Sequence, residues 1–332
     1  MIRNLIYDSG DLGYEVSWKN DYDGPASVKV RFSKIKMTRI QANLTLLLAG
    51  AIWGMGFVAQ SSAMDAVGPY TFIALRFLIA TLILIPLAWK ESRSATIPLS
   101  RKSWRGLCWI GCVLFLGMAS QQVGLLTTTV TNSGFLTGLY VVITPILTVL
   151  FLRQKPHFVI WPASVISTIG IYLMSGGDFA KLQTGDLLTI LCAFFWAIQV
   201  IMVGNLSRQT ARPMTLSAVQ FGVCALLGFI GALSFESFEL DAIRAATKEI
   251  LYAGIFSSGV AFTLQAIAQR YTTGPQAAIF LSSEALFAGL FGALFLGERI
   301  SGIGYVGCAM IFLAMILVEV VPEWIKVKQQ QT

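Results

Sequence analysis

The sequence predicts an all-α polytopic membrane protein in which ten transmembrane helices form two inverted repeats of five, with both termini in the cytoplasm. Composition is the first observation: 55% of the 332 residues are hydrophobic, 12% are charged and the mean hydropathy is +0.71, whereas soluble domains average about 25% charged residues. Soluble enzymes, disordered chains and collagen-like chains are therefore excluded. The other two observations are a series of long apolar stretches and a repeat that relates the two halves of the chain.

Ten apolar stretches follow one another from Ala42 onward, separated by short polar breaks. Each has about 18–22 residues, the length that a helix rising 1.5 Å per residue needs to cross a hydrocarbon core of about 30 Å. They must be helical, because a lipid-exposed backbone has to satisfy its own hydrogen bonds. We expect the spans at residues 42–61, 70–89, 104–126, 131–152, 158–176, 185–206, 213–234, 250–269, 276–296 and 300–321.

The segments outside the spans predict the orientation. Residues 1–40 are expected to be a disordered cytoplasmic segment, with a translation start at Met37 as the alternative, and residues 322–332 a cytoplasmic tail. Basic loops are retained in the cytoplasm, which places both termini of this multi-pass protein on the cytoplasmic side of the cell inner membrane. The pI near 9.2 reflects this bias and needs no nucleic-acid partner. The connections on the side opposite the N-terminus carry only Lys181, Arg244, Lys248 and Arg299.

The second half of the chain repeats the first, which divides it into repeats over residues 41–177 and 184–321. Each repeat has five spans, so the second copy enters the membrane inverted relative to the first. Two inverted copies can close the two sides of a central cavity in turn, which favours transport over a doubled scaffold. Equivalent positions at an offset of 144 are Pro69 and Pro213, Thr71 and Thr215, Phe77 and Phe221, Gln121 and Gln265, and Tyr140 and Glu284; at an offset of 143 they are Asn43 and Asp186, and Trp53 and Trp196.

Four segments are similar to the ten-span EamA-type members of the drug/metabolite transporter superfamily. They are Ala51-Ile52-Trp53-Gly54, Ala74-Leu75-Arg76-Phe77-Leu78, Ser133-Gly134-Phe135-Leu136-Thr137 leading to Thr144-Pro145, and Leu296-Gly297-Glu298-Arg299. The resemblance covers residues 40–321 and implies a permease or exporter of small organic solutes, such as amino acids and other metabolites, with a cavity between the halves. At one position the chain departs from the family, since Gln154 stands where the first repeat often has an acidic residue matching Glu298.

Two ionisable side chains lie well inside spans, where each costs about 2.5–3.5 kcal/mol on insertion scales. Glu284 falls about 15 Å into the ninth span, near the midplane. A carboxyl group there can contact a cation or couple transport to protons; the alternative is a neutral carboxyl bonded to a neighbouring helix. Arg76 lies about 9 Å into the second span from its outer end. We favour a structural role for Arg76, snorkelling to the interface or pairing with Asp65, over attraction of an anionic substrate group.

Polar side chains follow one face of the fourth span. Thr137, Tyr140 and Thr144 recur at spacings of three and four, a helical period, and we expect them to face a cavity or a close neighbouring helix. Phe280 and Glu284 are expected to line the same cavity from the ninth span. A cavity in which Phe280, Phe287 and Phe291 surround Glu284 favours a multidrug exporter.

Two symmetric pairs complete the candidate cavity. Gln121 and Gln265 carry amides that are costly against lipid, and they either bond a zwitterionic substrate from both halves or bond across helices. Trp53 and Trp196 lie in the middle of their spans, where an indole lines or gates a cavity more readily than it anchors an interface. Gln199 follows Trp196 by one turn.

These observations favour a transporter, and export is the expected direction. The expected partners are a small organic solute, amino-acid-like solutes first, the lipid bilayer and, through Glu284, protons. The alternatives are a multidrug exporter and a non-transporting scaffold or assembly subunit. No enzyme, cofactor or metal site is expected, because His157 is the single histidine and the five Cys all lie in apolar runs.

Overall fold

The computed structural model describes residues 37–95, 97–174, 183–237, 239–297, 299 and 301–331. The predicted disordered segment up to residue 36 lies outside these residues, as does Glu298. Within them every regular element is a helix. Nine helices are long and apolar enough to cross a membrane, and Ile160–Leu173 adds a shorter apolar helix. The prediction of an all-helical, multi-pass membrane protein is confirmed.

The helices follow one another with short connections. In chain order they are α1 (Arg39–Ala63), α2 (Pro69–Arg93), α3 (Arg101–Gly124), α4 (Val130–Gly138), α5 (Tyr140–Leu152), α6 (Ile160–Met174), α7 (Thr184–Thr210), α8 (Pro213–Phe235), α9 (Leu240–Ala245), α10 (Thr247–Tyr252), the π-helix η2 (Ala253–Ala261), α11 (Phe262–Ala268), α12 (Gly274–Leu281), α13 (Ser283–Leu296) and α14 (Gly302–Gln331). Residues expected to form the tail after 321 continue α14.

Two predicted spans are interrupted at equivalent points. The fourth breaks at Leu139, between α4 and α5, and the ninth breaks at Ser282, between α12 and α13, 143 residues later. At both breaks the chain tightens: Val142 N donates to Leu139 O and Ala285 N to Ser282 O, each at 3.1 Å, in the i to i−3 pattern of a 3₁₀ turn. Hydropathy does not reveal such a break, because the flanking residues stay apolar.

Helix ends are also repeated between the halves. Thr129 and Thr273 each accept a hydrogen bond from the backbone N–H three residues later, at 3.1 and 3.3 Å, and so cap the first turns of α4 and α12. At the far ends of the same spans, Arg153 and Gly297 adopt left-handed conformations with φ of 53° and 70°, which ends α5 and α13. Spans four and nine therefore start, break and end alike.

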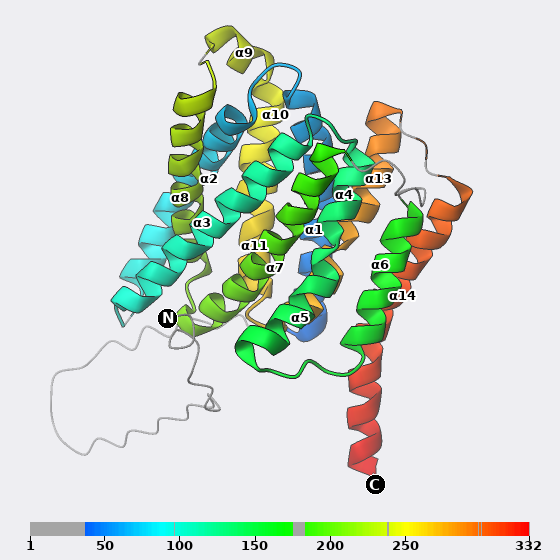
Figure 1. The fold of residues 1–332 in the computed structure, drawn as a ribbon. Helices are drawn as coiled ribbons and strands as arrows, with labels where there is room; N and C mark the ends of the chain where they lie inside the picture. The colour runs from blue at the N-terminus through cyan, green and yellow to red at the C-terminus, as the bar shows by residue number, and fades with distance from the viewer. Residues whose placement is uncertain are drawn as a thin grey trace, which may run out of the picture.

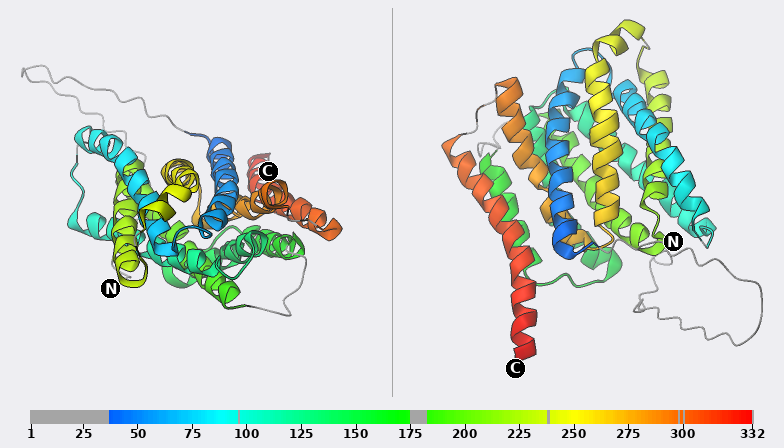
Figure 2. Two further views of the ribbon diagram at one scale, coloured as in Figure 1. Left: turned by 90° about the horizontal axis from the view of Figure 1, so that it is seen from above. Right: turned by 180° about the vertical axis from the view of Figure 1, so that it is seen from behind.

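The two halves interlock rather than forming separate domains. The most extensive helix pairings are α2 with α8, α3 with α7, α1 with α13 and α6 with α14, and every one of them joins a helix of the first half to a helix of the second. The α6–α14 pair lies at one edge of the bundle, and α14 extends beyond the neighbouring helices (Figures 1 and 2). The main core accordingly draws side chains from both halves.

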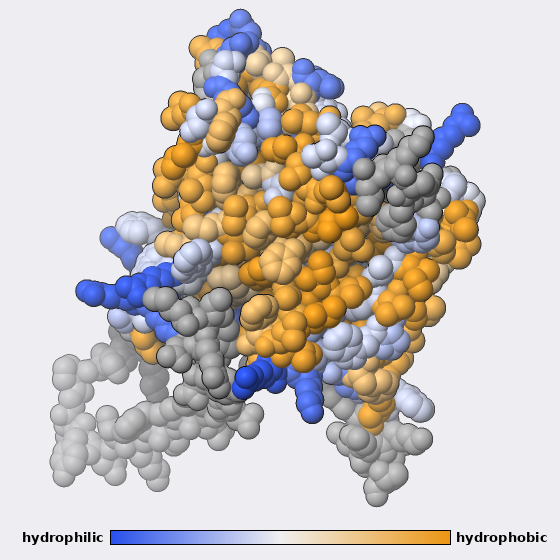
Figure 3. All heavy atoms as spheres, viewed as in Figure 1, coloured by the Kyte–Doolittle hydropathy of each residue, from blue (hydrophilic) through white to orange (hydrophobic). Residues whose placement is uncertain are grey.

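The bundle has two polar ends and an apolar middle. α1 begins and α14 ends at the same face of the bundle (Figure 1), where Arg39 Nη2 donates to Val318 O at 2.8 Å; we call this the chain-terminal face. In Figure 3 the surface between the two ends is largely apolar, and hydrophilic side chains gather toward the ends. Large exposed hydrophobics such as Leu82, Leu226 and Leu233 belong to this apolar surface, as expected where the surroundings are lipid.

α2 and α8 fasten each other at both ends. The Glu236 carboxylate, directly after α8, accepts the N–H groups of Tyr70 and Thr71 at 2.8 Å and the Thr71 hydroxyl at 2.7 Å. The Glu91 carboxylate, near the end of α2, does the same at the start of α8, accepting Thr215 N at 2.7 Å and Thr215 Oγ1 at 2.8 Å. A carboxylate neutralises the positive end of a helix dipole, so each helix caps the other.

The π-helix is not repeated in the equivalent span of the first half of the chain. The π-helix η2 interrupts the eighth span, whereas the equivalent third span is the continuous helix α3. A π-helix widens the turn and often marks a functional site. The duplicated scaffold is therefore locally asymmetric at η2.

Candidate functional site

A small pocket lies in the centre of the bundle and is lined by both halves. Its volume is about 10 Å³, room for about one water molecule, so it is too narrow for an organic solute in this conformation. The lining side chains come from α1, α2, α3, α7, η2, α11 and α13. They are Trp53, Phe57, Gln60, Arg76, Met118, Gln121, Trp196, Ser257, Phe262 and Glu284.

Three aromatic rings form one wall of this central pocket. The Trp53 and Trp196 ring centroids are 5.8 Å apart, and Phe262 lies 4.6 Å from Trp53 and 5.4 Å from Trp196. Trp53 Nε1 donates to Ser257 O at 2.9 Å, a carbonyl of the π-helix. Trp196 Nε1 is buried and has no hydrogen-bond partner among the described residues. The wall thus offers an apolar surface and one spare hydrogen-bond donor.

Equivalent residues of the two halves meet here. Trp53 contacts Trp196, and the Phe77 and Phe221 rings are 5.6 Å apart. A residue that touches its own equivalent must lie close to the axis that relates the two copies. The central pocket therefore lies on that axis, where inverted repeats place the contact between halves.

Glu284 is the carboxyl group of the central pocket. It is 6% exposed and sits in the first turn of α13, directly after the break at Ser282. No cation of the described part of the chain forms an ion pair with it. The Tyr140 hydroxyl is close enough to interact with it electrostatically, yet that hydroxyl makes no hydrogen bond of acceptable geometry.

Arg76 is the cation of the central pocket. It is 1% exposed, so the expectation that it snorkels or pairs with Asp65 is wrong: its side chain points into the bundle and bonds residues of α1 and η2. Its guanidinium donates to three neutral oxygens, at 2.8 Å to Gln60 Oε1, 2.8 Å to Ser257 Oγ and 2.9 Å to Ser258 Oγ. The Phe72 and Phe77 rings pack against it.

A separate cluster of amides lies in the second half. Gln199 and Gln265 exchange hydrogen bonds, Gln265 Nε2 donating to Gln199 Oε1 at 3.0 Å and Gln199 Nε2 to Gln265 Oε1 at 3.3 Å. Gln199 Nε2 also lies 3.5 Å from Gln220 Oε1. In the first half, Gln121 Nε2 donates to Thr137 Oγ1 at 2.9 Å. The two equivalent glutamines, 121 and 265, therefore bond within different sets of partners.

The predicted site residues fall into three groups. Trp53, Gln121, Trp196 and Glu284 line the central pocket, together with Arg76. Thr137 and Tyr140 touch its lining through Gln121 and Glu284. Those that do not line it are Thr144, Gln199, Gln265 and Phe280, and neither Phe287 nor Phe291 does so. The Thr144 hydroxyl donates to Tyr140 O at 2.7 Å, as a threonine within a helix often does.

Sequence reasoning missed half of the lining. Phe57, Gln60, Met118, Ser257 and Phe262 line the central pocket but were not predicted. A signal existed for two of them, because residues 53, 57 and 60 share one face of a helix. No sequence pattern marked the π-helix that aims two successive serines at Arg76.

Two larger cavities open toward the two ends of the bundle. One, of about 340 Å³, lies at the chain-terminal face and is lined by basic groups, among them Arg39, Lys155 and Arg208. The other, of about 420 Å³, lies at the opposite face and contains Glu236 and Glu239. The narrow central pocket thus lies between a basic cavity at one face and an acidic cavity at the other.

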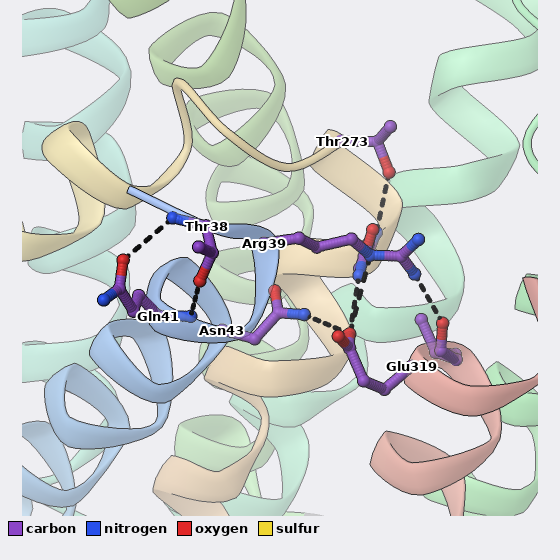
Figure 4. A network of polar contacts seen from close by, with 8 residues as sticks. Thr38, Arg39, Gln41, Asn43, Thr273 and Glu319 are labelled. Carbon is purple, nitrogen blue, oxygen red and sulfur yellow. Dashed lines mark hydrogen bonds and ion pairs between the residues drawn. The ribbon is translucent and has the colours of Figure 1, made fainter. Parts of the chain in front are cut away.

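A polar network borders the basic cavity. Asn43 Nδ2 donates to Glu319 Oε2 at 2.5 Å, and Arg39 Nε lies 3.5 Å from the same oxygen (Figure 4). At the opposite face Asp186, the equivalent of Asn43, accepts the Thr128 hydroxyl at 2.6 Å. Polar contacts therefore join residues of the two halves at both faces.

Metal ligands are not grouped in the part of the chain that the structure describes. No three His, Cys, Asp or Glu side chains come together there, and the five cysteines form no disulfide.

Comparison with known proteins identifies relatives over almost the whole chain. The model of the EamA-like transporter family matches residues 40–176 and 183–320. An "Uncharacterized transporter" of Archaeoglobus fulgidus is 31% identical, over 88% of this chain and 92% of that protein. The "Uncharacterized transporter YwfM" of Bacillus subtilis is 27% identical, over 84% of this chain and 94% of that protein.

More distant matches include a plant protein and a solved structure. The "WAT1-related protein At3g02690, chloroplastic" of Arabidopsis thaliana is 21% identical over 80% of this chain and 66% of that protein. A structure titled "Crystal structure of protein" superimposes with a TM-score of 0.70 at 18% identity, covering 86% of this chain and 99% of that one. At that identity the likeness is one of fold.

Proposed function

The chain belongs to the EamA-like transporter family, and we propose that it exports small organic metabolites, amino-acid-like solutes first among them, by alternating access between its two inverted repeats. The observation that carries this proposal is the central pocket, which lies on the axis between the halves and is lined by both. A pocket on that axis has the same relation to both faces of the bundle, as alternating access requires.

The small volume of the central pocket supports a carrier rather than an open channel. The central volume of about 10 Å³ holds about one water molecule, whereas cavities of about 340 and 420 Å³ lie at the two faces. A solute bound in the middle must therefore wait for a rearrangement before it leaves on either side. The breaks at Leu139 and Ser282 supply places where spans beside the pocket can bend.

The basic residues support an orientation. Arg39, Lys155 and Arg208 line the cavity at the chain-terminal face, and basic ends of spans are retained in the cytoplasm. We therefore assign the chain-terminal face to the cytoplasm and the acidic cavity to the outside of the cell inner membrane. A basic entrance on the inside favours solutes with an anionic group.

Residues of the central pocket would share the work of binding. Trp53, Trp196 and Phe262 supply an apolar wall, Gln121 an amide, and Glu284 a carboxyl group that can face a cationic group or carry a proton. The multidrug alternative gains no support, because the phenylalanines that it needs around Glu284 do not line the pocket.

Flux through proteoliposomes tests the proposal. Purified protein is offered a panel of labelled amino acids and other metabolites, with and without a pH gradient, beside Glu284→Gln. Asp241→Asn is the matched control, because it neutralises a carboxylate that is exposed on α9 and paired with Arg244. We expect saturable, gradient-dependent flux that Glu284→Gln abolishes and Asp241→Asn leaves unchanged.

The other outcomes assign different functions. Saturable flux that is the same with and without the pH gradient, and the same in Glu284→Gln, indicates facilitated diffusion. Glu284 would then be a structural residue. No flux of any compound, with the protein folded as judged by its unfolding transition, overturns the transport proposal in favour of a membrane scaffold or assembly subunit.

A further inference from the structure

The central pocket contains a buried positive charge that the protein does not neutralise. Arg76 is 1% exposed, and no carboxylate of the described part of the chain lies within ion-pair distance of it. Burying a guanidinium without a counter-charge is expensive, because the loss of hydration is not offset by Coulomb attraction. A structural cross-link between helices can be made by a neutral side chain, so the retained charge calls for another explanation.

The guanidinium is held in place and still has donors to spare. Its three acceptors, Gln60 Oε1, Ser257 Oγ and Ser258 Oγ, come from α1 and η2. Arginine carries five N–H groups in a planar fork, so about two remain, one on each terminal nitrogen. A planar pair of N–H groups matches a carboxylate in bidentate geometry.

The π-helix exists where this arrangement needs it. Ser257 and Ser258 are consecutive, and the widened turn of η2 lets both hydroxyls reach one guanidinium. The same turn presents Ser257 O to Trp53 Nε1, which joins the cation to the aromatic wall. The equivalent third span has neither the π-helix nor the serines, because Val113 and Leu114 stand at the equivalent positions.

The equivalent of Arg76 in the second half is a neutral residue. Gln220 stands 144 residues later, is fully buried, and lies in the amide cluster with Gln199. The scaffold therefore tolerates a glutamine at this position of the repeat. At this position of the repeat, the positive charge is therefore present in the first half of the chain and not in the second.

The central pocket also contains a carboxyl group. Glu284 and Arg76 line the same central pocket but form no ion pair with each other. We propose that Arg76 is the carboxylate-binding subsite of the pocket and that the bound solute is a zwitterion, its carboxylate on Arg76 and its ammonium group facing Glu284. This inference rests on the proposed transport function and names the substrate class.

The charge balance separates a zwitterion from other anions. With one guanidinium and one carboxyl group the pocket is neutral when both are charged, so a solute with one charge of each sign leaves it neutral. A phosphate dianion would meet a single guanidinium together with a repelling carboxylate. Trp196 Nε1 adds a buried donor without a partner, and the three rings of the wall suit an apolar side chain.

Carboxylate-deficient analogues test the subsite without any mutation. Wild-type protein in detergent is titrated with L-leucine and L-alanine and with their amides, L-leucinamide and L-alaninamide, and the unfolding midpoint reports binding; counterflow of labelled leucine in proteoliposomes is the second readout. We expect at least one amino acid to bind ten-fold or more tightly than its amide. 4-Methylvalerate, which has the carboxylate of leucine without the ammonium group, should also bind more weakly than leucine.

Variants then locate the subsite. Arg76→Gln, which installs the residue of the equivalent position, should weaken amino-acid binding ten-fold or more and amide binding less than two-fold. Arg76→Lys keeps the charge but not the planar fork, and should weaken amino-acid binding by an intermediate factor. Arg93→Gln removes a charge from the exposed end of the same helix, where Arg93 stacks on Trp89, and should change nothing.

Each alternative result has one meaning. Equal binding of amino acid and amide to the wild type, equal weakening of both by Arg76→Gln, or no binding of either amino acid by a protein that carries another panel compound overturns the subsite and leaves transport standing. No flux of any compound overturns transport itself. If Arg76→Gln fails to fold, the analogue series on wild-type protein still decides.

Discussion

Tyr140 and Glu284 occupy equivalent positions in the two halves of the chain and interact with each other beside the central pocket. Tyr140 is the first residue after the break at Leu139, and Glu284 is the second residue after the break at Ser282. One ancestral position has therefore become a phenol in one copy and a carboxyl group in the other.

Removing the Tyr140 hydroxyl should leave stability intact and alter coupling. That hydroxyl is buried without a hydrogen-bond partner among the described residues, and removing an unpaired polar atom is close to neutral. We expect Tyr140→Phe to change the free energy of unfolding by less than about 0.5 kcal/mol while changing the response of flux to a pH gradient. Tyr305→Phe, at an exposed tyrosine, is the control. A loss above about 1 kcal/mol would show that the hydroxyl does bond Glu284.

The two tryptophans of the aromatic wall should differ in their contribution to stability. Trp53 Nε1 donates to Ser257 O, whereas Trp196 Nε1 has no partner in the part of the chain described. Both substitutions to Phe remove similar apolar area, but Trp53→Phe also removes a hydrogen bond, so it should cost about 1 kcal/mol more than Trp196→Phe. Thermal unfolding in detergent measures the difference. Equal costs would contradict the role of the Ser257 carbonyl.

Loss of either carboxylate cap should destabilise the α2–α8 pair. Glu91→Ala and Glu236→Ala each remove an acceptor of backbone N–H groups at a helix start, and each should cost about 1–2 kcal/mol. The caps lie at opposite ends of helices about 30 Å long, so the double variant should show the sum of the single effects. Glu239→Gln, at an exposed carboxylate near Glu236, should be neutral. A clearly non-additive double variant would mean that the two ends are coupled.

Gly54 should tolerate no side chain. A Cβ there would lie 2.7 Å from the backbone carbon of Phe287 and 2.8 Å from Ala288 N, well inside van der Waals contact, because α1 packs closely on α13. Gly54→Ala should therefore lower the free energy of unfolding by about 1–3 kcal/mol. Gly302→Ala is the matched control, since nothing lies within 4 Å of a Cβ at that position. A neutral Gly54→Ala would show that the two helices can separate freely.

The sequence predicted the features that repeat along the chain. Hydropathy located the spans because each must cross the same apolar thickness. The offset of 143 matched Trp53 to its equivalent, and the offset of 144 matched Phe77 and Tyr140 to theirs. These are the residues that meet at the centre of the structure. Internal symmetry thus carried information on three-dimensional contacts that no single segment contains.

What the sequence did not predict depends on local geometry or on departures from symmetry. The π-helix η2 is as apolar as an α-helix would be, so Ser257 gave no sign that it reaches Arg76. Glu91 and Glu236 are 145 residues apart, which matches neither of the offsets, 143 and 144, that relate the two halves. Thr144 has the spacing of a cavity residue, but a helical threonine can bond its own backbone, and spacing alone does not distinguish the two.

The mutual caps of α2 and α8 decide which parts of the molecule are free to move. Sliding one helix along the other by a single residue, about 1.5 Å, would carry a carboxylate out of reach of its amides at both ends at once. α2 and α8 are therefore expected to move together as one rigid unit. Any opening of the proposed carrier would then occur where this pair contacts the other helices. Arg76 lies on α2, whereas Glu284 lies two residues after the break in its own span. If the protein works by the proposed alternating access, its opening would therefore change the distance between the two charges. A solute that bound both Arg76 and Glu284 would therefore be sensitive to how far the protein has opened.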